Sequence, residues 1–97
     1  MHVGAVAMDL KLPGCRSLKE KRAVVRPMVD GARRRFGVSA AEVDHHDRWQ
    51  RTVIGFAVVA STPSHAEELL DRTERFVWSH PEVEVISAVR DWLEVEG

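Results

Sequence analysis

The stretch QRTVIGFAVVAS at residues 50–61 contains the longest apolar run of the chain, at positions 53–60. The stretch predicts a strand over residues 50–61, and residues 38–46, which precede it, predict another. A short polar turn around Asp47-Arg48 separates the two segments. We therefore expect them to form a β-hairpin.

On the N-terminal side of this hairpin, the sequence predicts a helix. Ser17-Leu18-Lys19-Glu20 has the S-x-x-E form of a capping box, in which the serine oxygen accepts a hydrogen bond from a free helix amide and the glutamate reaches back. Gly37 is a natural stop. Pro27 removes one hydrogen bond within the segment and is expected to kink the helix. The apolar residues at helical spacing are Val25, Met28, Val29, Ala32 and Phe36.

On the C-terminal side, Thr62 and Pro63 predict the cap and the first position of a second helix, which His80-Pro81 ends. Its apolar stripe consists of Ala66, Leu69, Leu70, Thr73, Phe76 and Val77. Two more segments alternate as strands do, residues 2–12 and residues 82–89. The tail after them, residues 91–97, is acidic and carries Trp92 and Leu93 as candidate anchors.

The expected order is therefore strand, helix, strand, strand, helix, strand, within a single domain of residues 1–97. This order is typical of the α+β class and of the ferredoxin-like βαββαβ sandwich, a four-stranded antiparallel sheet with both helices on one face. If Ile54, Phe56 and Val58 face the helices, the alternate residues lie on an uncovered face. That face would be small and apolar, which is typical of an interface and predicts a homo-oligomer. Its expected members are Ala5, Ala7, Val53, Gly55, Ala57 and Val59.

Composition narrows the class of protein. The chain has 97 residues, and its only cysteine, Cys15, excludes a disulfide framework. No apolar run approaches the roughly 20 residues that a membrane span needs, and the first residues lack a signal peptide. We expect a cytoplasmic protein without a membrane partner.

Charge is distributed unevenly along the chain. Residues 11–51 contain 11 basic and 5 acidic residues, whereas residues 52–97 contain 3 basic and 9 acidic residues. The first helix carries a basic stripe that could follow a phosphate backbone, because guanidinium groups suit bidentate phosphate contacts. Alternatively, the stripe is a solvated helix face that Glu20 and Asp30 partly neutralise. The candidate nucleic-acid-binding residues are Arg16, Lys19, Arg22, Arg26 and Arg33.

The hairpin carries a second candidate site, which comprises Asp44, His46, Trp49 and Arg51. We expect Asp44 to face Arg51 across the hairpin as an opposite-charge pair. Asp44 and His46, with Glu42, could share one side of the strand, but structural zinc favours Cys and His sets that are absent. The structural interpretation is therefore preferred, and no catalytic residue, metal ligand or cofactor is assigned. Cys15 lies near a helix N-terminus, an environment that lowers the pKa of a thiol. The preferred interpretation is nevertheless a small residue in a turn, because the sequence has no second cysteine to resolve a disulfide.

Three strings together resemble one known family. They are PGCRSLKEKR at residues 13–22, EVDHHDRWQR at 42–51 and HPEVEV at 80–85. The chain resembles the YlxP-like family, small bacterial proteins of unknown function. The resemblance implies a ferredoxin-like fold and genes that lie near those for ribosome maturation and translation initiation.

We expect, from the basic stripe and this resemblance, a non-catalytic protein that binds RNA or the ribosome through its first helix and the hairpin. The alternative is a protein-interaction or homo-oligomerisation module without nucleic acid. A metal-dependent enzyme is the third interpretation.

Overall fold

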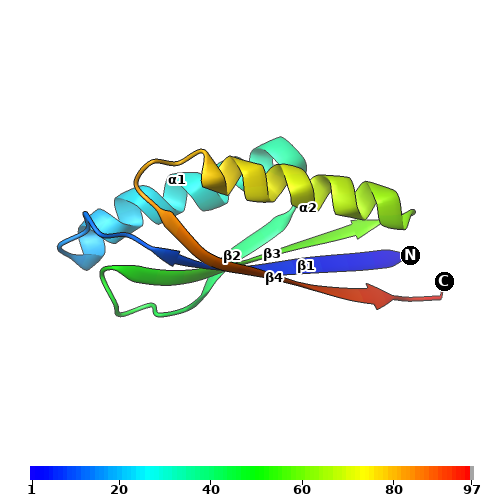
Figure 1. Ribbon diagram of the computed structural model, residues 1–97. Coiled ribbons are helices and arrows are strands. Elements are labelled where there is room, and N and C mark those ends of the chain that lie inside the picture. Colours follow the sequence, from blue (N-terminus) through cyan, green and yellow to red (C-terminus); the bar gives the residue numbers. More distant parts are fainter. Residues whose placement is uncertain (97) are drawn as a thin grey trace.

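The computed structural model describes residues 1–96 and contains six elements (Figure 1). In chain order these are β1 (His2–Lys11), α1 (Leu18–Phe36), β2 (Ser39–Asp44), β3 (Arg51–Ala60), α2 (Pro63–Trp78) and β4 (Glu84–Glu94). The strands form one antiparallel sheet in the order β2-β3-β1-β4. The predicted α+β class and βαββαβ order are confirmed.

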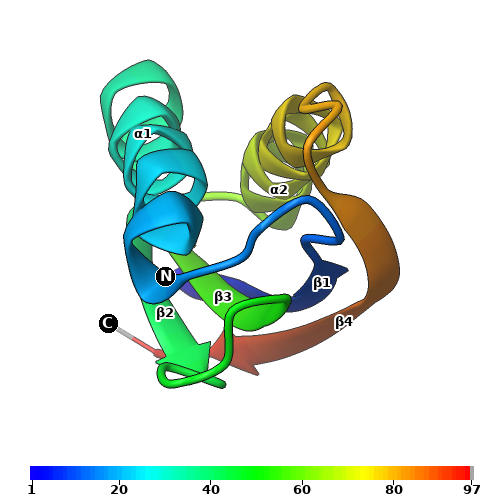
Figure 2. The ribbon, with the colours of Figure 1, turned by 90° about the vertical axis from the view of Figure 1, so that its left-hand side faces the viewer.

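Both helices lie on the same face of the sheet, and the other face is bare (Figures 1 and 2). The core lies between these two layers. Met8, Ile54, Phe56, Met28 and Leu70 are each at most 1% exposed. The predicted alternation of β3 is therefore confirmed, with its even-numbered residues turned to the helices.

The ends of both helices have the predicted capping residues. The Ser17 hydroxyl accepts a hydrogen bond from the Glu20 amide at 3.1 Å, and the Glu20 carboxylate accepts one from the Arg16 amide at 2.8 Å. Gly37 ends α1 with a φ of 66°, a left-handed conformation that glycine adopts without steric cost. The helix runs through Pro27 without a break. Thr62 caps α2 by accepting from the His65 amide at 3.2 Å.

The last strand is longer than expected. Residues 91–94, predicted to belong to a tail, continue β4 by pairing with residues 2–5 of β1. The Trp92 ring packs over Gly4 on the helix side of the sheet. Only glycine leaves room for this contact, because a Cβ at position 4 would lie 2.7 Å from the ring. The indole thus lies directly on the β1 backbone, which holds the end of β4 in the sheet.

None of the helices in residues 1–96 is both long and apolar enough to cross a membrane.

Candidate nucleic-acid interface

A buried lysine joins α1 to the β2–β3 hairpin. Lys21 is only 2% exposed, and its Nζ lies 3.0 Å from Oε2 of Glu42 in β2. The same ammonium donates to the carbonyl oxygens of His45 at 2.7 Å and His46 at 3.2 Å. Glu42 Oε2 also accepts a hydrogen bond from the Thr52 hydroxyl at 2.5 Å. The donors of Lys21 are thus occupied, so its role is to hold the hairpin rather than to bind a ligand.

The loop between β2 and β3 also packs against the loop before α1. The Gln50 side chain donates to the Cys15 carbonyl at 3.1 Å, and the Leu12 amide donates to the Gln50 carbonyl at 3.0 Å. Figure 2 shows both loops at the same end of the molecule, beside the start of α1. The first part of the basic stripe (Arg16, Lys19, Arg22 and Arg26) and the hairpin loop, two separate candidates in the sequence, therefore lie at one end of the molecule, which we call the basic end.

The cations of the basic end are exposed. Arg16, Lys19, Arg22 and Arg26 are exposed, and within residues 1–96 their side chains make no ion pair or hydrogen bond. A groove of about 610 Å³ runs between α1 and β2, with Arg22 and Arg26 at its wall. These four side chains are therefore free to contact an anion.

Arg33, the fifth predicted cation, has a different environment. Its Nη2 donates to the Ala40 carbonyl at 2.5 Å, and its Nη1 lies 3.3 Å from Asp30. His46 Nε2 lies 3.1 Å from the carbonyl of Glu42, which follows Ala40 in the same strand. Both side chains cover carbonyl groups of β2, an edge strand that could otherwise pair with another chain. Arg33 is thus partly engaged within the chain.

The hairpin loop adds an aromatic side chain and another cation to this end. Trp49 is 52% exposed, and Arg48 beside it is exposed as well. Exposed aromatic rings among cations are a common arrangement for stacking nucleic-acid bases. Arg48 was not among the predicted cations, although it lies in the same string as Trp49.

Two expectations about the hairpin are wrong. The register of β2 shifts between Glu42 and Asp44, so Asp44 pairs with Val53 and not with Arg51. Arg51 instead binds Asp9 of β1, with its Nη2 at 2.9 Å from both carboxylate oxygens. Glu42 pairs with the buried Ile54, which faces the helices, whereas Asp44 pairs with Val53 on the opposite side of the sheet, so the expected shared side does not form. In residues 1–96 no three His, Cys, Asp or Glu side chains gather as a metal site would require.

The expected environment of Cys15 is also wrong. Cys15 is buried, at 5% exposure, although it lies just before α1. Burial, followed by the negative charge of Glu20, raises the pKa of the thiol, and the positive charge of Lys21 opposes this only in part. A raised pKa disfavours the reactive thiolate.

Negative charge lies on the other side of the molecule, on α2 and β4. Arg90 of β4 forms ion pairs with Asp71, at 2.6 Å, and with Glu74. Burial opposes the charge of Arg90, but its hydrogen bonds to these two carboxylates outweigh burial and raise the pKa of the guanidinium. Arg90 is thus neutralised within the C-terminal half, whereas Arg16, Lys19, Arg22 and Arg26 at the basic end form no ion pair within residues 1–96.

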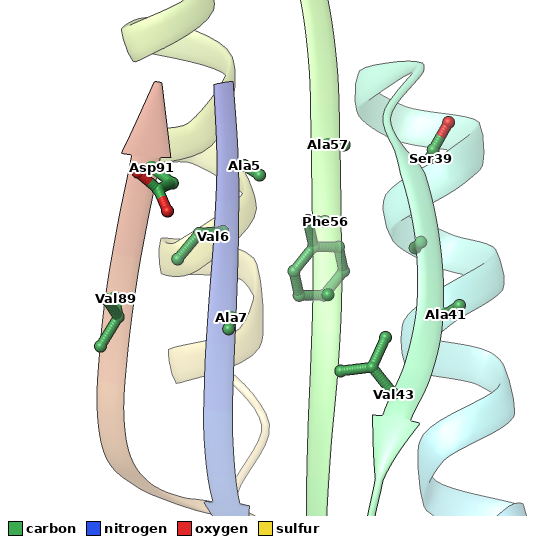
Figure 3. A pocket seen from close by; sticks show the side chains of 12 residues that line it. Ala5, Val6, Ala7, Ser39, Ala41, Val43, Phe56, Ala57, Val89 and Asp91 are labelled. Carbon is green, nitrogen blue, oxygen red and sulfur yellow. The ribbon is translucent and has the colours of Figure 1, made fainter. Parts of the chain in front are cut away.

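The bare face of the sheet is a shallow apolar trough of about 510 Å³ (Figure 3). Four of the six residues predicted for this face line the trough, namely Ala5, Ala7, Gly55 and Ala57. The other two, Val53 and Val59, share the same side of β3, and Val59 is 63% exposed. The edge strands contribute residues that were not predicted from the sequence, namely Ser39, Ala41, Val43, Val89 and Asp91.

Comparison with known proteins identifies a family and a relative that resemble this chain. Residues 3–90 match the family described as "Protein of unknown function (DUF503)". The chain is also similar to the protein described as "Uncharacterized protein YlxP" from Bacillus subtilis (strain 168). The two are 40% identical over 77 residues, which cover 79% of this chain and 84% of that protein.

Proposed function

The chain belongs to the DUF503 family, as its resemblance to YlxP-like proteins predicted, and we propose that it is a cytoplasmic, non-catalytic protein that binds RNA or the ribosome. The observation that carries this proposal is the group of unpaired cations at the basic end. Arg16, Lys19, Arg22 and Arg26 are exposed there, next to the hairpin that carries Trp49.

Charge segregation supports a polyanionic partner. Seven basic residues lie on α1 against only two acidic ones, whereas α2 has two basic and four acidic residues. Arg22 and Arg26 form no ion pair, although Asp30 and Glu42 also line their groove, and each phosphate that they contact would release counterions from the nucleic acid. The groove between α1 and β2 would let Arg22 and Arg26 follow a backbone while Trp49 stacks on a base.

The test replaces Arg22 and Arg26 with Gln, which preserves helix propensity. If both side chains neutralise a phosphate, each replacement reduces the slope of log affinity against log salt by about 0.7 on single strands, or about 0.9 on duplex. The matched control replaces Arg72 and Arg75 of α2 with Gln, the same charge change on the opposite helix. RNA binding should weaken only in the first variant, with an unchanged circular dichroism spectrum. Equal RNA affinity and salt dependence in the first variant and the wild type would show that the stripe is only a solvated face.

A second candidate function, a homo-oligomerisation module, is favoured by the bare apolar face. On this face, Val59, Val89 and Leu93 are 60–66% exposed. In a monomer these apolar side chains would stay in contact with water, whereas an interface would bury them. Sedimentation velocity should show an oligomer for the wild type and a monomer for Ala57→Arg, which places a charge in the trough. A wild type that stays monomeric at high concentration contradicts this candidate.

A further inference from the structure

The bare face is built of transverse rows, in which each residue lies beside its neighbours on adjacent strands. Two rows cross all four strands at the trough. The first row is Ser39, Ala57, Ala5 and Asp91, and the second is Ala41, Gly55, Ala7 and Val89. Figure 3 shows these rows, with β2 at one margin and β4 at the other. In both rows the two central residues are alanine or glycine.

The ends of each row differ in a complementary way. In the first row, the hydroxyl of Ser39 lies at the β2 end and the carboxylate of Asp91 at the β4 end. In the second row, the small Ala41 lies at the β2 end and the larger Val89 at the β4 end. A surface that reverses these rows would therefore place a hydroxyl over a carboxylate and a large side chain over a small one.

The bare face of a second copy of this chain provides such a surface. A twofold axis parallel to the strands reverses every row, so β4 of one copy lies over β2 of the other. Asp91 then faces Ser39 of the second copy, and Val89 faces Ala41. In the centre, Ala5 lies over Ala57 of the second copy, and small residues meet small residues.

The other simple arrangement has its twofold axis across the strands and places β4 over β4. Centred on the first row, it brings the two Asp91 carboxylates together. Centred between the rows, it places each Asp91 over Val89 without a hydrogen-bond partner. Both cases enclose a carboxylate charge without a compensating partner, which is unfavourable in an apolar contact.

The area also suits a dimer. β1 and β3 have ten residues each, and four strands are roughly 19 Å wide, so the face covers about 30 Å by 19 Å. Two such faces amount to roughly 1,100 Å², close to the lower bound of about 1,200 Å² for a specific protein interface.

We infer that this chain forms a face-to-face dimer, with an axis parallel to its strands and β4 of each copy over β2 of the other. This inference rests on the second candidate function and names its partner and geometry. Two sheets stacked with strands nearly aligned are a common sandwich packing.

Cysteine cross-linking tests the geometry. In a Cys15→Ala background, the variants are Ser39→Cys, Asp91→Cys and the double variant, all at exposed positions. With a short bifunctional thiol reagent, the double variant should give a covalent dimer on a denaturing gel, and each single variant should stay monomeric. Circular dichroism checks that all three variants fold.

Each alternative outcome has a distinct meaning. A covalent dimer from Asp91→Cys alone would place β4 over β4 and overturn the inferred axis. No cross-link in the double variant of a chain that sediments as a dimer would overturn the face-to-face geometry. A wild type that sediments as a monomer would remove the oligomer itself. The separate proposal that the basic end binds RNA would stand in each of these cases, because it is tested with Arg22 and Arg26.

Discussion

Lys21 holds the β2–β3 hairpin against α1, and it does so from a helix whose other cations mostly face solvent. Its neighbours Lys19 and Arg22 are exposed, whereas Lys21 faces the sheet and meets Glu42 and three hairpin carbonyls. Helical spacing places a residue on a face of the helix, but it does not identify a partner 21 residues away in the chain. The buried Lys21 therefore brings the hairpin loop to the exposed cations of the basic end.

Replacing Lys21 with Met should destabilise the protein by about 3 kcal/mol, because Glu42 and the hairpin carbonyls lose their shared donor. Urea denaturation measures this change in the free energy of unfolding. The control, Lys19→Met, removes an exposed cation of the same helix and should stay within about 0.5 kcal/mol of the wild type. The substitution Glu42→Gln should also reduce the free energy of unfolding less in the Lys21→Met variant than in the wild type, because the carboxylate has already lost its partner there. Simple additivity would show that the buried pair is not coupled.

Cys15 gives stability a specific dependence on pH. Its pKa is raised in the folded chain above the usual value of about 9. As the pH rises past that value, the thiol ionises in the unfolded chain but stays protonated in the folded chain. The unfolded chain then binds fewer protons, so the free energy of unfolding falls.

Urea denaturation at pH 8 and pH 10 checks this expectation. Cys15→Ala should lose less stability between the two pH values than the wild type does, since both share every other titrating group. The chain has no tyrosine that would titrate in this interval. Equal losses in the two proteins would mean that the thiol has the same pKa in both states.

At the scale of elements, the sequence predicted what depends on local chemistry. The Ser17 and Thr62 caps, the Gly37 stop and the alternation of β3 all follow from a few neighbouring residues. The bulge in β2 depends instead on how the strand meets β3, and one extra residue there moved Asp44 away from Arg51. The length of β4 likewise depends on its pairing with β1, and the acidic composition of residues 91–97 does not predict that pairing.

Gly4 tests how β4 is held. Replacing Gly4 with Ala would place a Cβ 2.7 Å from the Trp92 ring and 3.1 Å from Leu70. Overpacking of this kind costs about 1–3 kcal/mol, which chemical denaturation detects. The matched control is Gly14→Ala, where a Cβ would meet no atom within 4 Å. It should be nearly neutral, and an equal loss in both variants would mean that the contact with Trp92 is not the cause.

At the scale of the whole molecule, the inferred dimer axis determines where the two basic ends lie relative to each other. The basic end lies where β1 and β2 finish, and both chain termini lie at the other end (Figure 1). An axis parallel to the strands keeps the strand direction of both copies, so it places the two basic ends side by side. An axis across the strands would separate them to opposite ends of the dimer. The inferred dimer would therefore present two basic ends to one RNA.

Such a dimer predicts that RNA length decides how strongly dimerisation matters. A long single strand that reaches both basic ends gains from the second, intramolecular contact, and that gain exceeds about 10-fold for well-matched sites. Ala57→Arg should therefore weaken binding of the long strand by at least about 10-fold and leave a short strand, which fits one end, almost unchanged. Fluorescence anisotropy with both RNAs measures this, at a protein concentration where the wild type sediments as a dimer. The added arginine can only increase attraction to RNA, so charge cannot explain a loss. Equal effects on the two RNAs would show that the basic ends act separately, whatever the dimer geometry.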